Sequence, residues 1–149
     1  MDKVDLRILS ALQQDARLSY RALARRAGLS SPATAERVRK LEVAKTIQGY
    51  HARINPAALG YQVEALMSVT YPAQHSRRMY KLAHSTPEII ECLHVSGNAS
   101  VVLRVVARST QQLEQLMLKV QQIGTTETSI ILSVPLRRAA LEVARDQLA

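Results

Sequence analysis

The sequence predicts an α+β fold in two parts, with short helices first and strands alternating with helices afterwards. Apolar residues recur at helical spacing in the N-terminal third, and apolar and polar residues alternate in several later segments. The 149 residues are 47% hydrophobic and 21% charged, which is enough to bury the core of one medium domain or two small ones. Because Phe and Trp are absent, the core must be aliphatic, and single-strand binders that stack bases on aromatic side chains are disfavoured.

Positive charge is concentrated near the N-terminus. The formal net charge is +8, and residues 1–53 hold eleven Lys and Arg against five Asp and Glu, whereas the rest of the chain holds nine against seven. Taken alone, this excess describes a solvated basic surface as well as it describes a surface that binds an anionic polymer. The helical pattern of the same residues favours the second interpretation, in which the basic surface binds an anionic polymer.

The first element expected is a helix over residues 5–14. Leu6, Leu9 and Leu12 form an apolar stripe at helical spacing. Asp5 suits the N-terminus of this helix, because the helix dipole is positive there.

Two further short helices are expected over residues 19–42, with a tight turn between them. Ser19 and Ser30 are suitable N-caps, because their hydroxyls can accept hydrogen bonds from backbone amides of the following turn. Gly28 can adopt the left-handed conformation that ends the first of these helices. Pro32 fits the first turn of the second, where a missing N–H costs little. A short helix, a glycine turn and a basic second helix are the pattern of a helix-turn-helix DNA-binding module.

The second of these helices is expected to end near Ala44, and residues 46–54 predict a β-hairpin beside it. Such a hairpin would be the wing of a winged helix-turn-helix. Residues 55–60, NPAALG, are rich in turn-forming residue types and predict a linker. The expected organisation is therefore a DNA-binding domain over residues 1–54, this linker, and a second domain over residues 61–149.

The second domain is expected to contain four strands and two helices in the ferredoxin-like order βαββαβ. Its strands are expected over residues 61–71, 88–95, 100–108 and 128–134, and its helices over residues 76–83 and 110–123. Two helices cover one face of such a sheet and leave the other bare, so a second copy of the chain is expected to cover it in a homodimer. The tail, residues 136–149, is amphipathic and has the pattern of a further helix.

Several short motifs occur together in an order and spacing that resembles one family of bacterial and archaeal regulators. The motifs are DLRIL at residues 5–9, DARLS at 15–19, LA at 23–24, GLS at 28–30, ERVRKLE at 36–42, IQGY at 47–50, NP at 55–56, VSGN at 95–98 and TET at 126–128. The chain resembles the Lrp/AsnC (feast/famine) family of transcription regulators over nearly its whole length. This resemblance implies a dimer built on the C-terminal sheets, further assembly into tetramers or octamers around which DNA wraps, and amino-acid effectors bound between dimers.

Two residues depart from the pattern of the resembled family. Lys45 stands where the family usually has Gly, and a left-handed backbone there costs a non-Gly residue roughly 1 kcal/mol. Ser100 stands where the family usually has a carboxylate, which is a natural partner for the ammonium group of an amino acid.

The second helix of the helix-turn-helix is expected to enter the major groove, where its N-terminal residues read bases and its flanks bind phosphates. Ser31, Pro32 and Ala33 are expected at the tip of this helix, and Glu36, Arg37 and Lys40 are expected to follow on its outward face. The expected phosphate contacts are Arg25, Arg26, Lys40 and Lys45. Arg37 is the choice for a guanine contact, because a guanidinium can bond O6 and N7 together. The alternative is that each of these charged side chains is simply solvated. Two such modules in a dimer predict a palindromic operator.

The resemblance places the effector near the turn after the second strand of the second domain. The expected effector-binding residues are Gly97, Asn98, Ala99, Ser100, Thr126 and Thr128. The alternative is a structural role, since Gly97 and Asn98 suit any tight hairpin and threonine is ordinary in a strand.

The same sequence argues against catalysis, metal binding and secretion. Its four His residues have no metal-ligand spacing and no paired carboxylates nearby, and it contains no glycine-rich phosphate loop. Cys92 is the only cysteine, so no disulfide can form within the chain, which fits the cytoplasm. No segment resembles a signal peptide or a membrane span. We therefore expect no catalytic residues, no metal and no cofactor.

The function predicted is that of a sequence-specific DNA-binding transcriptional regulator, modulated by a small effector such as an amino acid bound between dimers. Its expected partners are double-stranded DNA, the effector and copies of itself in a homodimer, tetramer or octamer, and no membrane. Two alternatives remain open at this point. One is an architectural DNA-binding protein of the same fold that acts without an effector, and the other is a metabolite sensor with weak DNA binding.

Overall fold

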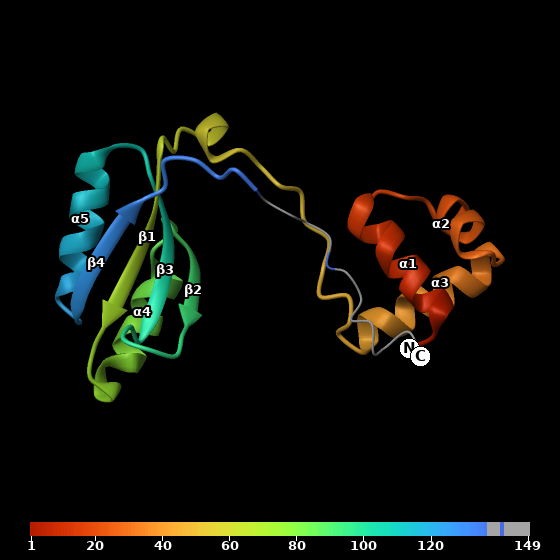
Figure 1. The fold of residues 1–149 in the computed structure, drawn as a ribbon, viewed down its shortest axis with the longest axis horizontal. Helices are drawn as coiled ribbons and strands as arrows, with labels where there is room; N and C mark the ends of the chain where they lie inside the picture. The colour runs from red at the N-terminus through yellow and green to blue at the C-terminus, as the bar shows by residue number, and fades with distance from the viewer. Residues whose placement is uncertain (137–140, 142–149) are drawn as a thin grey trace. The chain divides into compact units, whose positions relative to one another are not determined.

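The computed structural model of the chain describes residues 1–136 and residue 141 (Figure 1). These residues form two compact units, of which the first contains residues 1–52 and the second residues 53–134. The predicted α+β class is confirmed, because helices form the first unit and a sheet with helices forms the second. The predicted tail helix over residues 136–149 falls almost entirely outside the described residues. Within the described part of the chain, no helix is long and apolar enough to cross a membrane.

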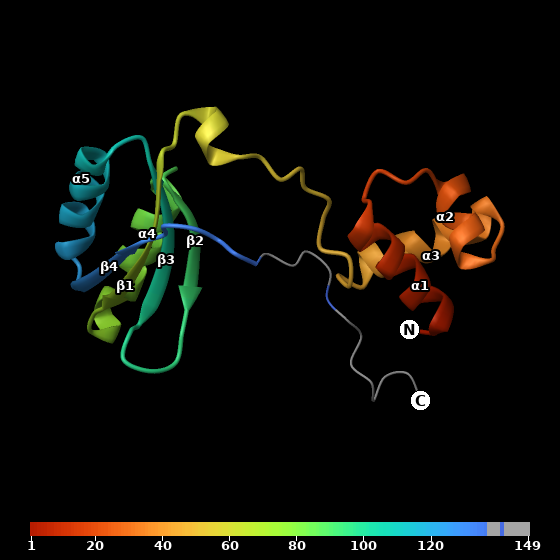
Figure 2. The ribbon, with the colours of Figure 1, turned by 45° about the horizontal axis from the view of Figure 1, so that its top comes forward.

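Three helices make up the first unit, and two of them begin at the predicted capping residues. The helices are α1 (Lys3–Gln14), α2 (Tyr20–Ala27) and α3 (Ser31–Val43) (Figure 2). The hydroxyl of Ser19 accepts a hydrogen bond from the amide of Ala22 at 3.2 Å. The hydroxyl of Ser30 likewise accepts one from the amide of Ala33 at 3.3 Å. Helix α2 ends at Gly28, whose φ of 73° is left-handed as predicted.

Helix α1 begins two residues earlier than predicted, because Asp2 caps it. One carboxylate oxygen of Asp2 accepts hydrogen bonds from the amides of Val4 and Asp5, at 2.8 and 2.9 Å. In return, the carboxylate of Asp5 accepts a hydrogen bond from the amide of Asp2 at 2.9 Å. The two acids therefore form a capping box, which satisfies backbone amides that have no partner within the helix.

The core of the first unit is aliphatic, as the composition predicts. Its buried residues are Ile8, Ala11, Leu23, Ala27, Val38 and Leu41. Thr34 is also fully buried, and its hydroxyl donates a hydrogen bond to the carbonyl of Ser30 at 2.9 Å. Thr34, Val38 and Leu41 recur at helical spacing, so one face of α3 belongs to the core and the opposite face is exposed.

The predicted wing over residues 46–54 is wrong. These residues are all described, and none of them belongs to a strand. The amides of Thr46 and Ile47 both donate to the carbonyl of Leu41, at 2.9 and 3.1 Å, and so complete the C-terminus of α3. A hairpin would need these amides in its first strand, so the helix end and the hairpin compete for them.

The second unit contains one antiparallel sheet with the strand order β2-β3-β1-β4. Its elements are the 3-10 helix η1 (Pro56–Leu59), β1 (Val63–Thr70), the 3-10 helix η2 (Ala73–His75), α4 (Ser76–Ser85), β2 (Ile89–His94), β3 (Val101–Ala107), α5 (Thr110–Gln121) and β4 (Thr125–Ile130). The predicted βαββαβ order is confirmed.

The last strand begins three residues earlier than predicted, at Thr125 instead of residue 128. The mostly apolar residues 130–134 favour the later position, but β4 is mainly a threonine-rich segment that pairs with β1, with Thr126 opposite Val69. Hydrogen bonding to a central strand outweighs hydrophobic pattern here, because strand preference depends strongly on the neighbouring strand.

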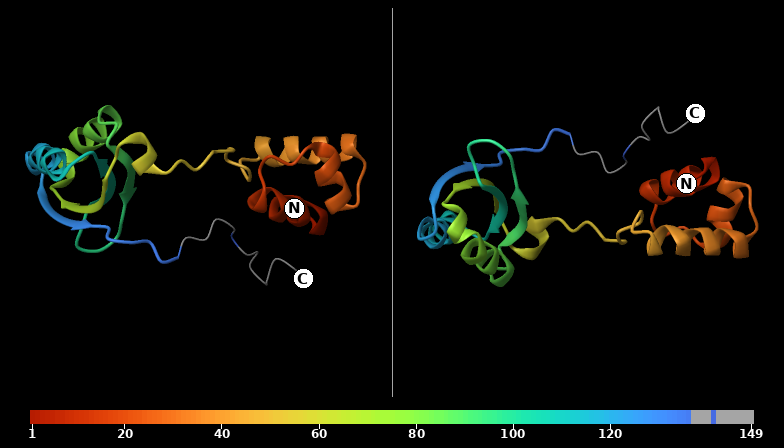
Figure 3. Two further views of the ribbon diagram at one scale, coloured as in Figure 1. Left: turned by 90° about the horizontal axis from the view of Figure 1, so that it is seen from above. Right: turned by 90° about the horizontal axis from the view of Figure 1, so that it is seen from below.

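One face of the sheet carries the core of the second unit, and α4 and α5 lie on that face (Figure 3). The core residues of β1 and these helices are Ala65, Met67, Val69, Met79, Leu113, Leu116 and Val120. On the opposite face, Leu66 and Leu93 are 40% and 45% exposed. This face therefore presents apolar side chains that the described part of the unit does not bury.

Candidate nucleic-acid interface and effector site

The turn between α2 and α3 exposes the N-terminus of α3. The amides of Gly28 and Leu29 both donate to the carbonyl of Ala24, at 2.9 and 3.0 Å, which ends α2 and redirects the chain. The first turn of α3 then consists of the three predicted tip residues, Ser31, Pro32 and Ala33. Ser31 is partly exposed and the other two are exposed, so the predicted base-reading tip lies at an open helix end.

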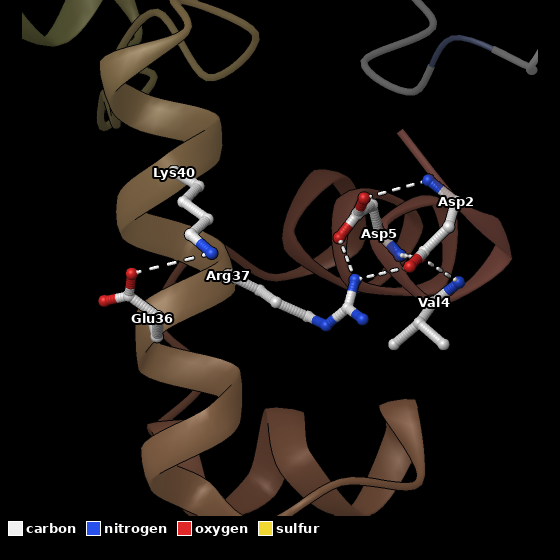
Figure 4. A network of polar contacts seen from close by, with 6 residues as sticks. All are labelled: Asp2, Val4, Asp5, Glu36, Arg37 and Lys40. Atoms are coloured by element: carbon white, nitrogen blue, oxygen red, sulfur yellow. Dashed lines mark hydrogen bonds and ion pairs between the residues drawn. The ribbon is translucent and has the colours of Figure 1, made fainter.

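Three charged residues cover the outward face of α3. The carboxylate of Glu36 accepts two hydrogen bonds from the guanidinium of Arg39, at 2.8 and 3.0 Å. It also lies 3.8 Å from the ammonium group of Lys40 (Figure 4). The hydrogen bond from Arg39 holds the pKa of Glu36 below its ordinary value. Arg39 is missing from the predicted site, although its spacing of three residues from Glu36 was the signal that could have placed it on this face.

Arg37 points from α3 toward the N-terminus of α1 and not outward (Figure 4). Its Nη1 atom lies 2.7 Å from Oδ2 of Asp2 and 2.7 Å from Oδ1 of Asp5. Hydrogen bonds from Arg37 to Asp5 and Asp2 raise the pKa of the guanidinium. The predicted outward orientation of Arg37 is therefore wrong, whereas its guanine contact stays a prediction. The signal for the correct placement is that Arg37 lies three residues after the buried Thr34, on the flank of the core face.

The same network predicts a specific sensitivity to acid. The amide of Asp5 and the guanidinium of Arg37 hydrogen-bond to the Asp2 carboxylate and hold its pKa below the ordinary value of 3.8. Because the folded-state pKa is lowered, the stability from these contacts is complete above the ordinary pKa and is lost as the pH falls through the folded-state pKa. We expect the free energy of unfolding in urea to fall less between about pH 5 and pH 2 for Asp2→Asn than for the wild type. An equal fall in both proteins would show that the Asp2 carboxylate does not contribute to the acid sensitivity.

The predicted phosphate contacts Arg25, Arg26 and Lys45 lie at C-terminal helix ends. Arg25 and Arg26 are exposed in the last turn of α2, where positive charge also interacts favourably with the helix dipole. Lys45 follows α3 and is also exposed. Its φ of 57° shows that the left-handed conformation is present even though the residue is not glycine.

Lys45 holds a left-handed C-cap that glycine would adopt without steric cost. Its amide donates to the carbonyl of Glu42 at 3.0 Å, and the amide of Thr46 donates to that of Leu41 at 2.9 Å, which are the bonds of a Schellman motif. We expect Lys45→Gly to raise the free energy of unfolding in urea by about 1 kcal/mol. Ala44→Gly, one residue earlier in a right-handed conformation, is the matched control and is expected to lower it. If the Lys45→Gly protein is no more stable than the wild type, the left-handed backbone of Lys45 is not strained.

The turn between β2 and β3 carries four of the predicted effector-binding residues, and it is fastened to the end of β1. Gly97 in this turn has a φ of 113°, which favours glycine. The carbonyl of Asn98 accepts a hydrogen bond from the hydroxyl of Thr70 at 2.9 Å. The hydroxyl of Ser100 bonds to both the amide and the carbonyl of Tyr71, each at 3.2 Å. Ser100 therefore has a structural role in this turn.

The two predicted threonines lie on β4, on the other side of β1 from β3. The hydroxyl of Thr126 accepts a hydrogen bond from the side-chain amide of Gln121 at 3.2 Å. The hydroxyl oxygen of Thr128 is buried and has no hydrogen-bond partner among the described residues. Thr128 lies opposite the fully buried Met67 of β1, so its side chain is on the core face of the sheet, where an unpaired hydroxyl costs about 1–3 kcal/mol.

The chemistry of this region is that of hydroxyls and backbone groups. In the described residues, no group of three or more His, Cys, Asp or Glu is arranged to hold a metal ion. The region can therefore donate and accept hydrogen bonds to a small polar molecule.

Cys92 is partly buried on β2, and burial raises the pKa of its thiol. This environment suits the predicted role of a small apolar residue better than that of a nucleophile.

Known protein families match both units. Residues 1–42 match the model of the AsnC-type helix-turn-helix domain, and residues 64–141 match that of the Lrp/AsnC ligand binding domain. The HTH-type transcriptional regulator LrpA of Mycobacterium tuberculosis is 36% identical over 137 residues, which cover 89% of this chain and 91% of that protein.

Solved structures agree with these matches. LrpC of B. subtilis superposes with a TM-score of 0.85 at 31% identity, covering 90% of this chain and 96% of the other. The feast or famine regulatory protein from M. tuberculosis complexed with L-methionine superposes with a TM-score of 0.82 at 34% identity, covering 91% and 95%. The chain is thus a helix-turn-helix transcriptional regulator with a ligand-binding domain, and not an enzyme. It belongs to the Lrp/AsnC family, as its motifs predict.

Proposed function

We propose that this regulator recognises a palindromic operator through α3 and that an amino acid adjusts its DNA binding. The amino acid would bind beside the β2–β3 turn and β4, between two dimers of the chain. The observation that supports this most strongly is the buried hydroxyl of Thr128, which has no hydrogen-bond partner in the described structure. A polar ligand that reached this oxygen would relieve its desolvation cost. The free energy gained in this way can shift the equilibrium between dimers and larger assemblies toward the form that binds the ligand.

The DNA-binding residues are assigned by their exposure on the helix-turn-helix. The first turn of α3 is proposed to touch base edges, and its later residues are proposed to reach bases or phosphates beside that turn. The base-reading set is Ser31, Pro32, Ala33, Glu36 and Lys40, and the phosphate-binding set is Arg25, Arg26, Arg39, Lys40 and Lys45. Arg37 is proposed to hold α3 against α1 through its two carboxylate partners instead of contacting guanine.

The effector is proposed to be a small amino acid that makes few charged contacts. The complex of an Lrp/AsnC relative with L-methionine supports an amino acid as the ligand class. In this chain Ser100 replaces a carboxylate and is already bonded to the backbone of Tyr71. The ammonium group of the ligand would therefore be met by carbonyls and hydroxyls of the turn and of β4, where Thr126 and Thr128 stand.

Isothermal titration calorimetry against the twenty amino acids tests this proposal. We expect heat of binding from at least one of them in the wild type and about a tenfold weaker affinity in Thr128→Val, because valine has the shape of threonine without its hydroxyl. Thr110→Val, the same substitution at an exposed threonine at the start of α5, is the control and should leave the affinity unchanged. Absence of heat with all twenty amino acids would contradict the proposal.

A homodimer through the open sheet face is proposed as the smallest assembly. The exposed Leu66 and Leu93 on that face support this, because a second copy of the face would bury them. Tetramers or octamers, which the family implies, would bring effector sites between dimers. A monodisperse monomer at micromolar concentration in light scattering would refute the dimer.

The proposed organisation keeps a DNA-binding domain over residues 1–54, a linker over residues 55–60 and an effector-binding and oligomerisation domain over residues 61–149. The proposed location is the cytoplasm. A second candidate function is an architectural DNA-binding protein that acts without an effector, and the serine at position 100 favours it. DNA affinity that no amino acid changes would select this second function.

A further inference from the structure

Helix α4 carries a basic face that lies outside the helix-turn-helix. The helix contains three Lys or Arg residues and no acidic residue. Met79 is fully buried in the core of the second unit and fixes which side of α4 faces the sheet. At helical spacing, Arg77, Lys81 and His84 fall in one stripe on the other side, and all three are exposed. Arg78 is exposed beside this stripe.

The positive charge of the second unit is concentrated on this helix. Residues 53–134 contain seven Lys and Arg against five Glu, and three of those seven cations stand on α4, so the rest of the unit holds four against five. Helix α5, on the same face of the sheet, balances Lys119 with Glu114. Within the described residues, no ion pair involves a cation of α4.

Helix stability does not explain this placement. Arg77 and Arg78 lie in the first turn of α4, where the helix dipole makes positive charge unfavourable. The N-cap residue, His75, makes no side-chain capping bond that would offset this. On the neighbouring strand, Glu91 lines a hollow with His84 near the far end of the helix. The cations of the first turn therefore face solvent without a compensating charge in the described unit.

We propose that the exposed face of α4 is a second DNA-binding surface, which binds the phosphates of duplex DNA without reading bases. Arg77 and His84 are about 10 Å apart along the helix axis at 1.5 Å per residue, a length over which duplex DNA carries about six charges. Duplex DNA is the polyanion that matches this charge and that a helix-turn-helix regulator already binds. The proposal extends the DNA contacts beyond α3, and it rests on the chain binding DNA.

The test compares two full-length variants that lose the same charge. Arg77→Gln with Lys81→Gln removes two cations from α4, and Arg108→Gln with Lys119→Gln removes two exposed cations from elsewhere in the same unit. Each protein is titrated with a mixed-sequence duplex of about 100 base pairs at salt concentrations from about 50 to 200 mM. Each phosphate contact contributes about 0.9 to the magnitude of the slope of log affinity against log salt. The magnitude of this slope should therefore be smaller by about 1.8 per bound chain in the α4 variant than in the wild type. The control should keep the wild-type slope.

Each result is decisive for the α4 surface. An unchanged slope in the α4 variant overturns the proposal, and so does an equal change in both variants, which would assign the effect to net charge. A third variant, Arg25→Gln with Arg26→Gln, reports on the helix-turn-helix separately. If this variant loses affinity and the α4 variant does not, DNA binding through the first unit stands and the α4 surface falls. If the wild type binds no DNA, both the proposed DNA-binding function and the α4 surface are disproved. Because glutamine is a good helix former and all substituted positions are exposed, matching far-UV CD spectra are expected throughout.

Discussion

Replacing Arg37 with Ala is expected to destabilise the first unit and to weaken binding to all DNA sequences by the same factor. The guanidinium bridges Asp2 and Asp5, whose carboxylates also form the capping box of α1. Removal of Arg37 leaves these two acids next to each other without the cation that they share. Their mutual repulsion then opposes both the start of α1 and its packing beside α3.

Urea unfolding and DNA selection together measure this effect. Arg37→Ala should lower the urea midpoint, and Asp5→Ala should lower it by less in the Arg37→Ala background than in the wild type, because the two changes share the ion pair and only the capping-box bond of Asp5 remains to be lost. Lys40→Ala is the matched control, since Lys40 is an exposed cation on the same helix and does not contact α1. It should leave the urea midpoint nearly unchanged.

A guanine contact by Arg37 would give a different pattern. The variant would then keep the wild-type urea midpoint and lose about tenfold or more in discrimination at one base pair of the operator. Selection of bound sequences from a random duplex library separates the two roles, because a positioning residue leaves the base preference unchanged at every position.

Gly124→Ala is expected to destabilise the second unit by about 3 kcal/mol, because the added methyl group has no space. A Cβ at residue 124 would collide with the carbonyl oxygen of Thr70 and lie 2.8 Å from Cβ of Tyr71. The colliding group is backbone of the central strand β1, which cannot move aside as a flexible side chain would. The clash also lies at the strand end to which the turn with Asn98 and Ser100 is fastened.

Gly60→Ala is the matched control for this prediction. Gly60 belongs to the same unit and has a φ of 87°, but a Cβ there would meet no atom within 4 Å. Its replacement should therefore cost only the conformational strain of about 1 kcal/mol. Urea unfolding followed by CD measures both variants. Equal losses would show that steric contact with β1 does not determine the choice of glycine at residue 124.

The helix-turn-helix could be predicted closely because its signals are local. Ser19, Gly28 and Ser30 act on backbone groups within four residues of themselves, so their roles follow from the sequence alone. The partner of Arg37 is of another kind, since Asp2 and Asp5 are 35 and 32 residues away. Helical spacing could place Arg37 on the flank of α3, but only packing shows that α1 brings two carboxylates to it.

The errors in the strands have a similar cause. Residues 46–54 have strand-like composition, but a strand needs a partner, and the amides of Thr46 and Ile47 are used by α3. In β4 the apolar residues after Ser129 suggested a strand centred too late, whereas pairing with β1 begins at Thr125. In both places the deciding hydrogen bonds involve residues that the local pattern does not reveal.

The candidate effector site was predictable as a location but not as a set of contacts. The resemblance directed attention to the turn with Gly97 and to the two threonines, and both lie beside β1. It did not reveal that the hydroxyl of Ser100 is bonded to Tyr71, or that the hydroxyl of Thr128 lacks a partner in the described structure. These differences depend on how side chains pack between strands, and sequence spacing carries no information about that.

Operator affinity with and without the bound amino acid is the most direct test of the account. The operator is first selected from a random duplex library with the full-length protein, and its affinity is then measured with and without the amino acid identified by calorimetry. We expect a palindromic sequence with half-sites about one helical turn apart, and an affinity change of about fivefold or more in the wild type that is lost in Thr128→Val. A protein that selects no sequence, or whose operator affinity no amino acid changes, would contradict an effector-controlled DNA-binding regulator.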